Sequence, residues 1–262
     1  MRIFDVHVHV YPDRLAQRAT GSIGTFYDGM EAHGRGSLAD CLARMDAVGV
    51  ERFAAHSAAT SPHNVESINH FIREAHARHP ERIVPFAALH PDMEDMQGTV
   101  DGIVSEGFRG IKLHPDMQGF AVDGDRAAPM MEALAGRRPL LIPCGDPRYN
   151  FDGPLHILRL RERFPKQPII AAHFGGWSEL QEAEDLLPGH DLMFDTSSTL
   201  YQYPPEKVVE VIRRFGVENM IYGSDYPMFS PEEELERFLR LPLTDREFED
   251  ILWNNAARLL QL

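Results

Sequence analysis

Short apolar or β-branched runs alternate with amphipathic stretches along the whole chain. Because parallel strands need long crossover connections, strands that alternate with helices predict a parallel sheet. Eight runs are predicted as strands: Ile3–His9, Arg52–His56, Ile83–His90, Gly107–His114, Pro139–Pro143, Pro168–His173, Asp191–Thr196 and Met220–Asp225.

The segments between these runs carry helical signals. Apolar residues recur three and four positions apart from Leu38 to Val48, from Val65 to Ala75 and from Val208 to Phe215, which predicts amphipathic helices. Ser230, followed by a proline and by glutamate at the third helical position, predicts a helix start. Thr244 with a glutamate three residues later predicts a capping box.

Eight strand–helix units in 262 residues predict an α/β fold of one domain, a (β/α)8 barrel over residues 1–262. A doubly wound open sheet is the alternative, but no glycine-rich phosphate fingerprint follows the first strand. The segment from His9 to Ser37 contains five glycines and is predicted as a mobile loop over the barrel mouth.

Composition narrows the function classes. With 26 basic and 40 acidic residues the formal charge is −14, which argues against nucleic-acid and anionic-membrane partners and leaves a small-molecule substrate. The chain has no apolar run of membrane-spanning length, and Met1–Asp5 enters a strand without a signal-peptide pattern. Only two cysteines occur, so no disulfide framework is expected and a cytoplasmic location is predicted.

The first predicted strand carries candidate metal ligands. Strand alternation predicts Asp5, His7 and His9 on one face, toward the barrel interior, and Phe4 and Val6 on the other, toward the helices. Two imidazoles at the carboxyl end of a barrel strand lie where such barrels build active sites and suit one metal ion. Two solvated histidines are the alternative.

Two later strand ends strengthen the metal hypothesis. The last predicted strand ends in Asp225, a natural ligand or a base for a metal-bound water. A helix-capping aspartate is the alternative, which the following Pro227 and the later cap at Ser230 disfavour. His173 ends the sixth predicted strand, where a strand meets a glycine-containing turn.

Four ordered motifs resemble the amidohydrolase superfamily: Asp5-x-His7-x-His9, Ala172-His173-Phe174-Gly175-Gly176, Gly223-Ser224-Asp225-Tyr226-Pro227 and Asn254-Asn255-Ala256-Ala257-Arg258-Leu259-Leu260. More narrowly, they are similar to the branch of small hydrolases and decarboxylases related to aminocarboxymuconate semialdehyde decarboxylase. The resemblance implies a (β/α)8 barrel and one divalent metal ion, usually zinc, held by His7, His9 and Asp225 with an activated water. It also implies that His173 is a catalytic acid/base or a further ligand, and related barrels often form homodimers.

One position departs from the family pattern. The fifth strand usually ends in a histidine ligand, whereas this chain has Pro143 there, which offers no donor. His7, His9 and Asp225 still make three ligands, the number a catalytic zinc site takes from protein. His173 or the neighbouring Cys144 is the alternative additional ligand.

Four further residues are predicted to bind substrate. Lys112 and His114 share the inward parity of the fourth strand; Lys112 either pairs with Asp5 or another acid, meets a substrate carboxylate, or is carboxylated and bridges two metals. Arg148 is a candidate carboxylate anchor, and Trp177 a candidate apolar wall; a surface arginine and a core tryptophan are the alternatives.

The predicted function is a metal-dependent hydrolase. An activated water would attack an amide, ester or lactone carbonyl, with Asp225 or His173 as general base and then acid. The first alternative is a lyase that decarboxylates an unsaturated carboxylic acid, with Lys112 or Arg148 holding the carboxylate. The second is a barrel with a decayed site, suggested by Pro143, that binds a metabolite or a partner.

Overall fold

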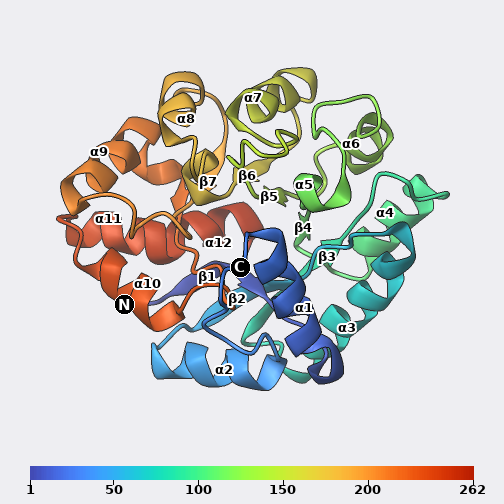
Figure 1. The fold of residues 1–262 in the computed structure, drawn as a ribbon, viewed down its shortest axis with the longest axis horizontal. Helices are drawn as coiled ribbons and strands as arrows, with labels where there is room; N and C mark the ends of the chain where they lie inside the picture. The colour runs from blue at the N-terminus through green and yellow to red at the C-terminus, as the bar shows by residue number, and fades with distance from the viewer.

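The strands of the computed structural model, which describes residues 1–262, form one closed parallel barrel (Figure 1). Neighbours in sequence are neighbours in the sheet throughout, and backbone bonds from Val6 to Tyr222 and from His9 to Tyr226 join the last strand to the first. The open-sheet alternative is therefore excluded. The strands are β1 (Phe4–His9), β2 (Arg52–His56), β3 (Ile83–Ala88), β4 (Gly110–Lys112), β5 (Leu140–Ile142), β6 (Ile169–Ala171), β7 (Met193–Asp195) and β8 (Met220–Ile221).

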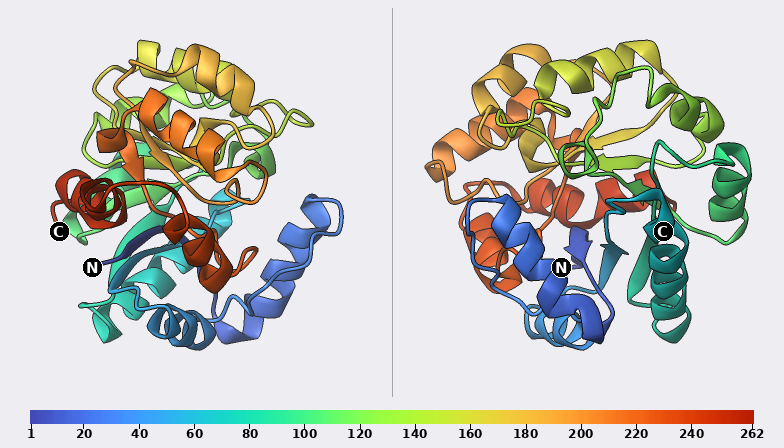
Figure 2. Two further views of the ribbon diagram at one scale, coloured as in Figure 1. Left: turned by 90° about the vertical axis from the view of Figure 1, so that its left-hand side faces the viewer. Right: turned by 45° about the vertical axis from the view of Figure 1, so that its right-hand side comes forward.

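Helices surround the barrel (Figures 1 and 2). The helices predicted from apolar spacing are present as α2, α3 and α9, and Thr244 forms the predicted capping box with Glu247. No helix combines the length and the apolar character that crossing a bilayer requires. The helices are α1 (Asp13–Phe26), α2 (Leu38–Ala47), α3 (Val65–Arg78), α4 (Met96–Ser105), α5 (Pro115–Gln118), α6 (Ala128–Leu134), α7 (Pro154–Arg163), α8 (Leu180–Leu186), α9 (Pro205–Phe215), α10 (Pro231–Leu239), α11 (Asp245–Glu249) and α12 (Asn255–Leu260).

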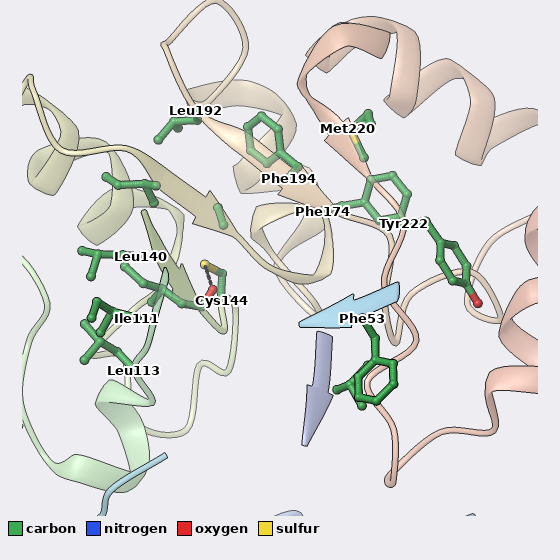
Figure 3. Packing of buried hydrophobic residues seen from close by; sticks show 14 of the residues in the cluster. Phe53, Ile111, Leu113, Leu140, Cys144, Phe174, Leu192, Phe194, Met220 and Tyr222 are labelled. Carbon is green, nitrogen blue, oxygen red and sulfur yellow. Dashed lines mark hydrogen bonds between the residues drawn. The ribbon is translucent and has the colours of Figure 1, made fainter. Parts of the chain in front are cut away.

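The apolar core has two main parts and a third cluster of three residues, Ala59, Val65 and Ala88. The larger lies between the strands and the helices, where Ile111, Leu140 and Phe194 pack outward (Figure 3). The smaller joins side chains from β1, β2, β3, β5, β6 and β8, which can meet only inside the barrel, and Trp253 packs edge-on to Phe4. Both parts are needed because each barrel strand has one face toward the interior and one toward the helices, and each face is buried against different side chains.

Strand β1 contains an irregularity that strict alternation does not predict. Its register against β2 shifts between Asp5 and Val8, and such a bulge reverses which face the following side chains take. Phe4 and Val6 precede Val8, where the pairing resumes, and lie in the interior cluster, whereas Val8 lies in the outer one, so the prediction that Phe4 and Val6 face the helices is wrong. Asp5 instead accepts bonds from the backbone N–H groups of His7 and Ser224, each at 3.0 Å, and so holds the bulge.

The segment after β1 is not the irregular loop predicted from its glycines. Asp13–Phe26 forms helix α1, which lies on the viewer's side of the barrel in Figure 1, at the carboxyl ends of the strands. Its buried face consists of Ala16, Thr20 and Gly24, spaced by four residues. A Cβ on Gly24 would lie 2.3 Å from the Met30 carbonyl oxygen, so this glycine serves close packing rather than flexibility.

Candidate active site

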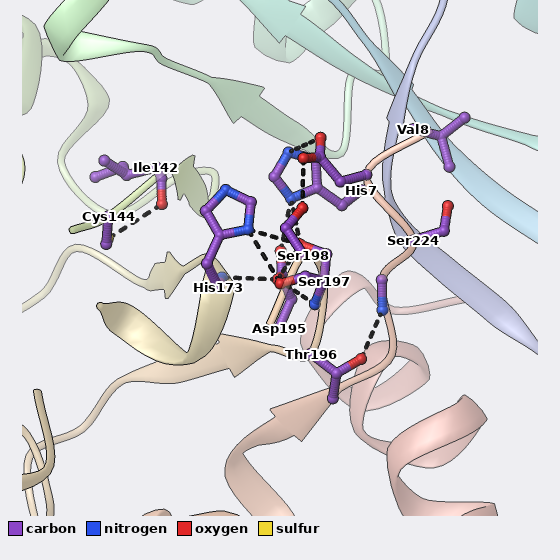
Figure 4. Close-up of polar contacts among 12 residues, drawn as sticks. His7, Val8, Ile142, Cys144, His173, Asp195, Thr196, Ser197, Ser198 and Ser224 are labelled. Atoms are coloured by element: carbon purple, nitrogen blue, oxygen red, sulfur yellow. Dashed lines mark hydrogen bonds and ion pairs between the residues drawn. The ribbon is translucent and has the colours of Figure 1, made fainter. Parts of the chain in front are cut away.

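The carboxyl ends of six strands bring the polar residues of the site together. His7 and His9 come from β1, His56 from β2, Lys112 from β4 and Asp195 from β7. His173 and Asp225 follow β6 and β8. All seven are mostly or fully buried, and Figure 4 shows His7, His173 and Asp195 directed toward one another from their separate strands.

The three residues predicted as metal ligands converge. Asp225 Oδ1 lies 3.5 Å from His7 Nε2 and 3.4 Å from His9 Nε2. The three donor atoms thus face one shared space, as the ligands of a single ion must. Their role as ligands stays a prediction, since the geometry supplies the donors and not the ion.

A carboxylate that the sequence analysis missed orients this set. Asp195 Oδ2 lies 2.8 Å from His7 Nδ1, so Nδ1 carries the proton and Nε2 is left as the donor atom for a metal. Asp195 Oδ1 accepts from the backbone N–H groups of His173 and Ser197 and from the Ser197 hydroxyl (Figure 4). One buried carboxylate therefore fixes His7, His173 and the loop after β7.

The backbone is strained where three of these strands end. His173, Ser198 and Asp225 have φ values of 59°, 55° and 59°, a left-handed conformation that is unfavourable for residues with a Cβ. Hydrogen bonds hold them there, including one of 2.6 Å from the Ser198 hydroxyl to Asp225 Oδ2. Such strain at strand ends turns the side chains into the barrel mouth.

Burial and neighbouring charges set the protonation of the site. Burial acts to raise the pKa of Asp225, but the adjacent His7, His173 and His9 outweigh it and hold that pKa well below its usual range. Burial lowers the pKa values of His9 and His173 to about 4. His9 and His173 are therefore neutral and the Asp225 carboxylate is ionised near pH 7, which are the states that metal binding requires.

Lys112 lies against the same donor set. Its Nζ donates to His7 Nε2 at 2.8 Å, so its partner is His7 rather than Asp5. Burial lowers the pKa of Lys112 to about 8, and it still carries a proton at pH 7. A metal ion bound at His7 Nε2 would compete with the Lys112 ammonium group for the single lone pair of that nitrogen.

Although Pro143 stands where the family has a histidine ligand, other side chains at the site still offer metal-donor atoms. Pro143 lines the cavity without a ligating atom, but a nitrogen of His56 lies within 4.8 Å of ligand nitrogens of His7 and His9. His9 Nδ1 and His56 Nδ1 are buried without hydrogen-bond partners. His7 Nε2 and His9 Nε2, which face the ionised Asp225 carboxylate, fit a divalent cation. His56 Nε2, by contrast, already accepts from the backbone N–H of Val8 at 3.2 Å.

Outward from these residues lies a cavity at the barrel mouth. Tyr27, Trp177 and Phe229 give it aromatic walls, and His173 and Asp225 lie on its lining. The cavity thus joins an apolar binding space to the polar centre.

The other predicted substrate residues differ in their surroundings. His114 lies near Lys112, but its Nε2 is 3.1 Å from the Tyr27 hydroxyl. Arg148 forms a two-pronged pair with Asp146 and a further pair of 2.6 Å with Asp28, so its guanidinium is already neutralised. Trp177 lines the cavity as expected of a wall. Substrate binding by all four stays a prediction.

Sequence reasoning overlooked three acids at this mouth. Asp195 is the penultimate residue of the predicted strand Asp191–Thr196 and follows two apolar residues, so a carboxylate near a strand end, as for Asp225, could have identified it. Asp116 and Asp152 lie in connecting segments, and only the tertiary structure places them on the cavity lining.

Comparison with known proteins agrees with this geometry. A family model described as Amidohydrolase matches residues 4–262. The decarboxylase orsB of Emericella nidulans is 27% identical over 183 residues, covering 58% of this chain and 52% of that protein. The chain therefore spans about half the length of this curated relative.

Solved structures share the fold over the whole chain. An uncharacterized TIM-barrel protein from Bordetella bronchiseptica has a TM-score of 0.81 at 22% identity, covering 100% of this chain and 99% of its own. A dihydroxybenzoic acid decarboxylase from Polaromonas with bound manganese has a TM-score of 0.76 at 17% identity, with coverages of 100% and 97%. A 5-carboxyvanillate decarboxylase from Novosphingobium aromaticivorans, also with manganese, gives 0.76 at 16%, with the same coverages.

These findings correct the functional prediction. The expected hydrolase is wrong, because the relatives described above whose names state an activity are decarboxylases. The lyase alternative agrees with them. The barrel, the convergent donors and the match over residues 4–262 lead to one conclusion: this chain belongs to the amidohydrolase family, in its branch related to aminocarboxymuconate semialdehyde decarboxylase.

Proposed function

We propose that this protein is a metal-dependent, non-oxidative decarboxylase of an aromatic carboxylic acid. The observation that carries the proposal is a cavity with aromatic walls that reaches Asp225 and adjoins a smaller pocket, lined by His7 and His9, to which Asp225 also belongs. The side chains of Tyr27, Trp177 and Phe229 offer aromatic contacts to an aromatic substrate, and the named decarboxylases with this fold support the same chemistry.

The three convergent residues would hold one divalent ion. When bound, it supplies Lewis-acid stabilisation to an oxygen of the substrate. The resemblance to the family implies zinc, while two decarboxylases of similar fold contain manganese. Two imidazoles and a carboxylate suit either ion, so both are to be tested.

The chain's own residues would bind the acid and move the proton. Lys112 is the buried cation that can hold a carboxylate oxygen. The bond between the ring and carboxyl carbons breaks, carbon dioxide leaves, and the electron pair on the ring carbon takes a proton. His173 would take that proton from water at Nε2 and pass it to the ring carbon, because its Nδ1 keeps its own hydrogen directed at the Ser197 carbonyl oxygen, 3.2 Å away, which can only accept.

The test is product analysis on protein loaded with zinc or with manganese. We expect carbon dioxide release from one or more hydroxylated benzoic acids, with deuterium entering the ring in heavy water. Asp225→Asn and His173→Ala should lower turnover by about 100-fold or more, whereas His70→Ala on the exposed face of α3 should not. Hydrolysis of amides or lactones without carbon dioxide release would refute the proposal.

A further inference from the structure

Two aspartates line the cavity away from the metal-donor residues. Asp116 comes from α5, after β4, and Asp152 from the segment before α7. They are 7% and 1% exposed. In a ring of eight strands, β4 and β5 lie across the barrel from β8, which carries Asp225. The two carboxyl groups therefore face the cavity from the side opposite that ligand.

Neither aspartate has a cationic partner. Asp116 Oδ1 accepts from the backbone N–H of Phe151 at 3.2 Å, and Asp152 Oδ2 is buried with no hydrogen-bond partner. The third acid at this end, Asp146, differs because Arg148 neutralises it through two short hydrogen bonds. Two unneutralised carboxyl groups thus remain on the lining of a binding cavity.

The chemistry of such a pair limits what can bind beside it. Burial raises the pKa values of both groups, and Asp116 raises the pKa of Asp152 further, whereas the hydrogen bond from Asp152 acts to lower the pKa of Asp116, so the pair retains a proton near neutral pH. A pair with one shared proton offers several acceptor atoms and repels a second anion. A group that donates a hydrogen bond would satisfy the buried oxygen, which otherwise costs stability.

We propose that Asp116 and Asp152 form a specificity subsite that receives a hydroxyl or amino substituent of the substrate ring and rejects a second carboxylate there. The inference rests on the proposed function only in taking the substrate as an aromatic acid. It makes the pair a determinant of which acids bind, and leaves the bond-breaking step to the opposite side of the cavity.

The experiment measures binding, not turnover. Calorimetric titration of the metal-loaded protein compares benzoate with its 3- and 4-substituted hydroxyl, amino, methoxy and carboxylate derivatives. The hydroxyl or amino acid should bind about tenfold or more tightly than benzoate or the methoxy acid. The dicarboxylates should bind more weakly than benzoate. Hydroxyl and amino derivatives are titrated separately, which identifies the preferred donor.

The variants are Asp116→Asn, Asp152→Asn and both together, with Asp125→Asn on the exposed surface as the matched control. The aspartate variants should lose the preference for donors and gain affinity for the dicarboxylates, while benzoate binding and the control stay unchanged. Wild-type protein without the preference, or variants that retain it, would overturn the subsite. The wild-type comparison remains decisive even if a variant does not fold.

Failure of the subsite is distinguishable from failure of the decarboxylase. Selective binding without carbon dioxide release would support the subsite and refute the decarboxylase activity. Carbon dioxide release without selective binding would support the activity and refute the subsite. If none of these acids binds to the metal-loaded protein, both proposals are wrong.

Discussion

Single residues show how the centre depends on groups behind the metal donors. Asp195 holds His7 Nδ1 at 2.8 Å and also accepts from His173 N and from Ser197. A carboxylate in this position fixes the tautomer and direction of a ligating imidazole. We therefore expect loss of the Asp195 charge to lower the metal affinity.

We expect Asp195→Asn to weaken metal binding by about 10- to 100-fold, because the amide cannot hold the His7 imidazole with the same charge. Competition with a chromophoric chelator measures the affinity. Asp191→Asn, at the exposed end of the same segment, is the control. Equal affinity in both variants would show that Asp195 has no role in orienting His7.

Lys112 gives a second prediction at this scale. Lys112→Met removes the cation that donates to His7 Nε2, so metal affinity should be maintained or rise. The KM for an aromatic acid should rise by about 10- to 100-fold, since a charge-assisted hydrogen bond to the carboxylate is lost. Steady-state kinetics and metal titration separate the two effects, with exposed Lys166→Met as the control. A large loss of metal would instead support a carboxylated Lys112 among the ligands.

Among the elements, α1 has the most direct consequence for the site. Its last residue, Phe26, stacks on Tyr149 at 4.6 Å between ring centroids, and the adjoining Asp28 pairs with Arg148. The Tyr27 hydroxyl lies 3.1 Å from His114 Nε2. The carboxyl end of α1 is thus attached to the segments after β4 and β5, and it covers the cavity.

Phe26→Ala should loosen this attachment, because it removes the aromatic stack that joins the end of α1 to the segment after β5. We expect amide hydrogen exchange in Asp13–Phe26 to accelerate by about tenfold while α2 stays unchanged as the internal reference. Exchange that rises equally in both helices would indicate general destabilisation and not opening of α1.

For the whole molecule, the buried acids of the cavity make stability depend on pH. Burial raises the pKa of Asp116 from 3.8 to about 6. A carboxyl group whose pKa is higher in the folded chain stabilises the fold fully below pH 3.8, and that stabilisation is lost as the pH rises through about 6. The protein should consequently lose stability between these values.

In Asp116→Asn this loss should be smaller, so the variant should melt about 2 °C or more above the wild type at pH 8 and close to it at pH 4. Thermal denaturation across this pH range measures the difference, and Asp125→Asn should follow the wild type. Parallel curves for Asp116→Asn and wild type would contradict the raised pKa.

The sequence by itself determined the barrel and the identity of its central residues. The alternation of strands and helices required a parallel sheet, and the position of His7, His9, His173 and Asp225 at strand ends placed them at one mouth, because parallel strands end on the same face. These signals depend only on residues close together in sequence, so the spacing of apolar and polar positions is enough to predict the strands and their ends.

Only the tertiary structure decided what depends on contacts between distant segments. The bulge in β1 changed the direction of Asp5, close packing made a helix of the glycine-containing segment before Phe26, and Asp195 met His7 across 188 residues. Asp116 and Asp152 likewise meet at the cavity from different connections. Periodicity carries no information about these pairs, because register, burial and the competition among partners are settled only when the barrel closes.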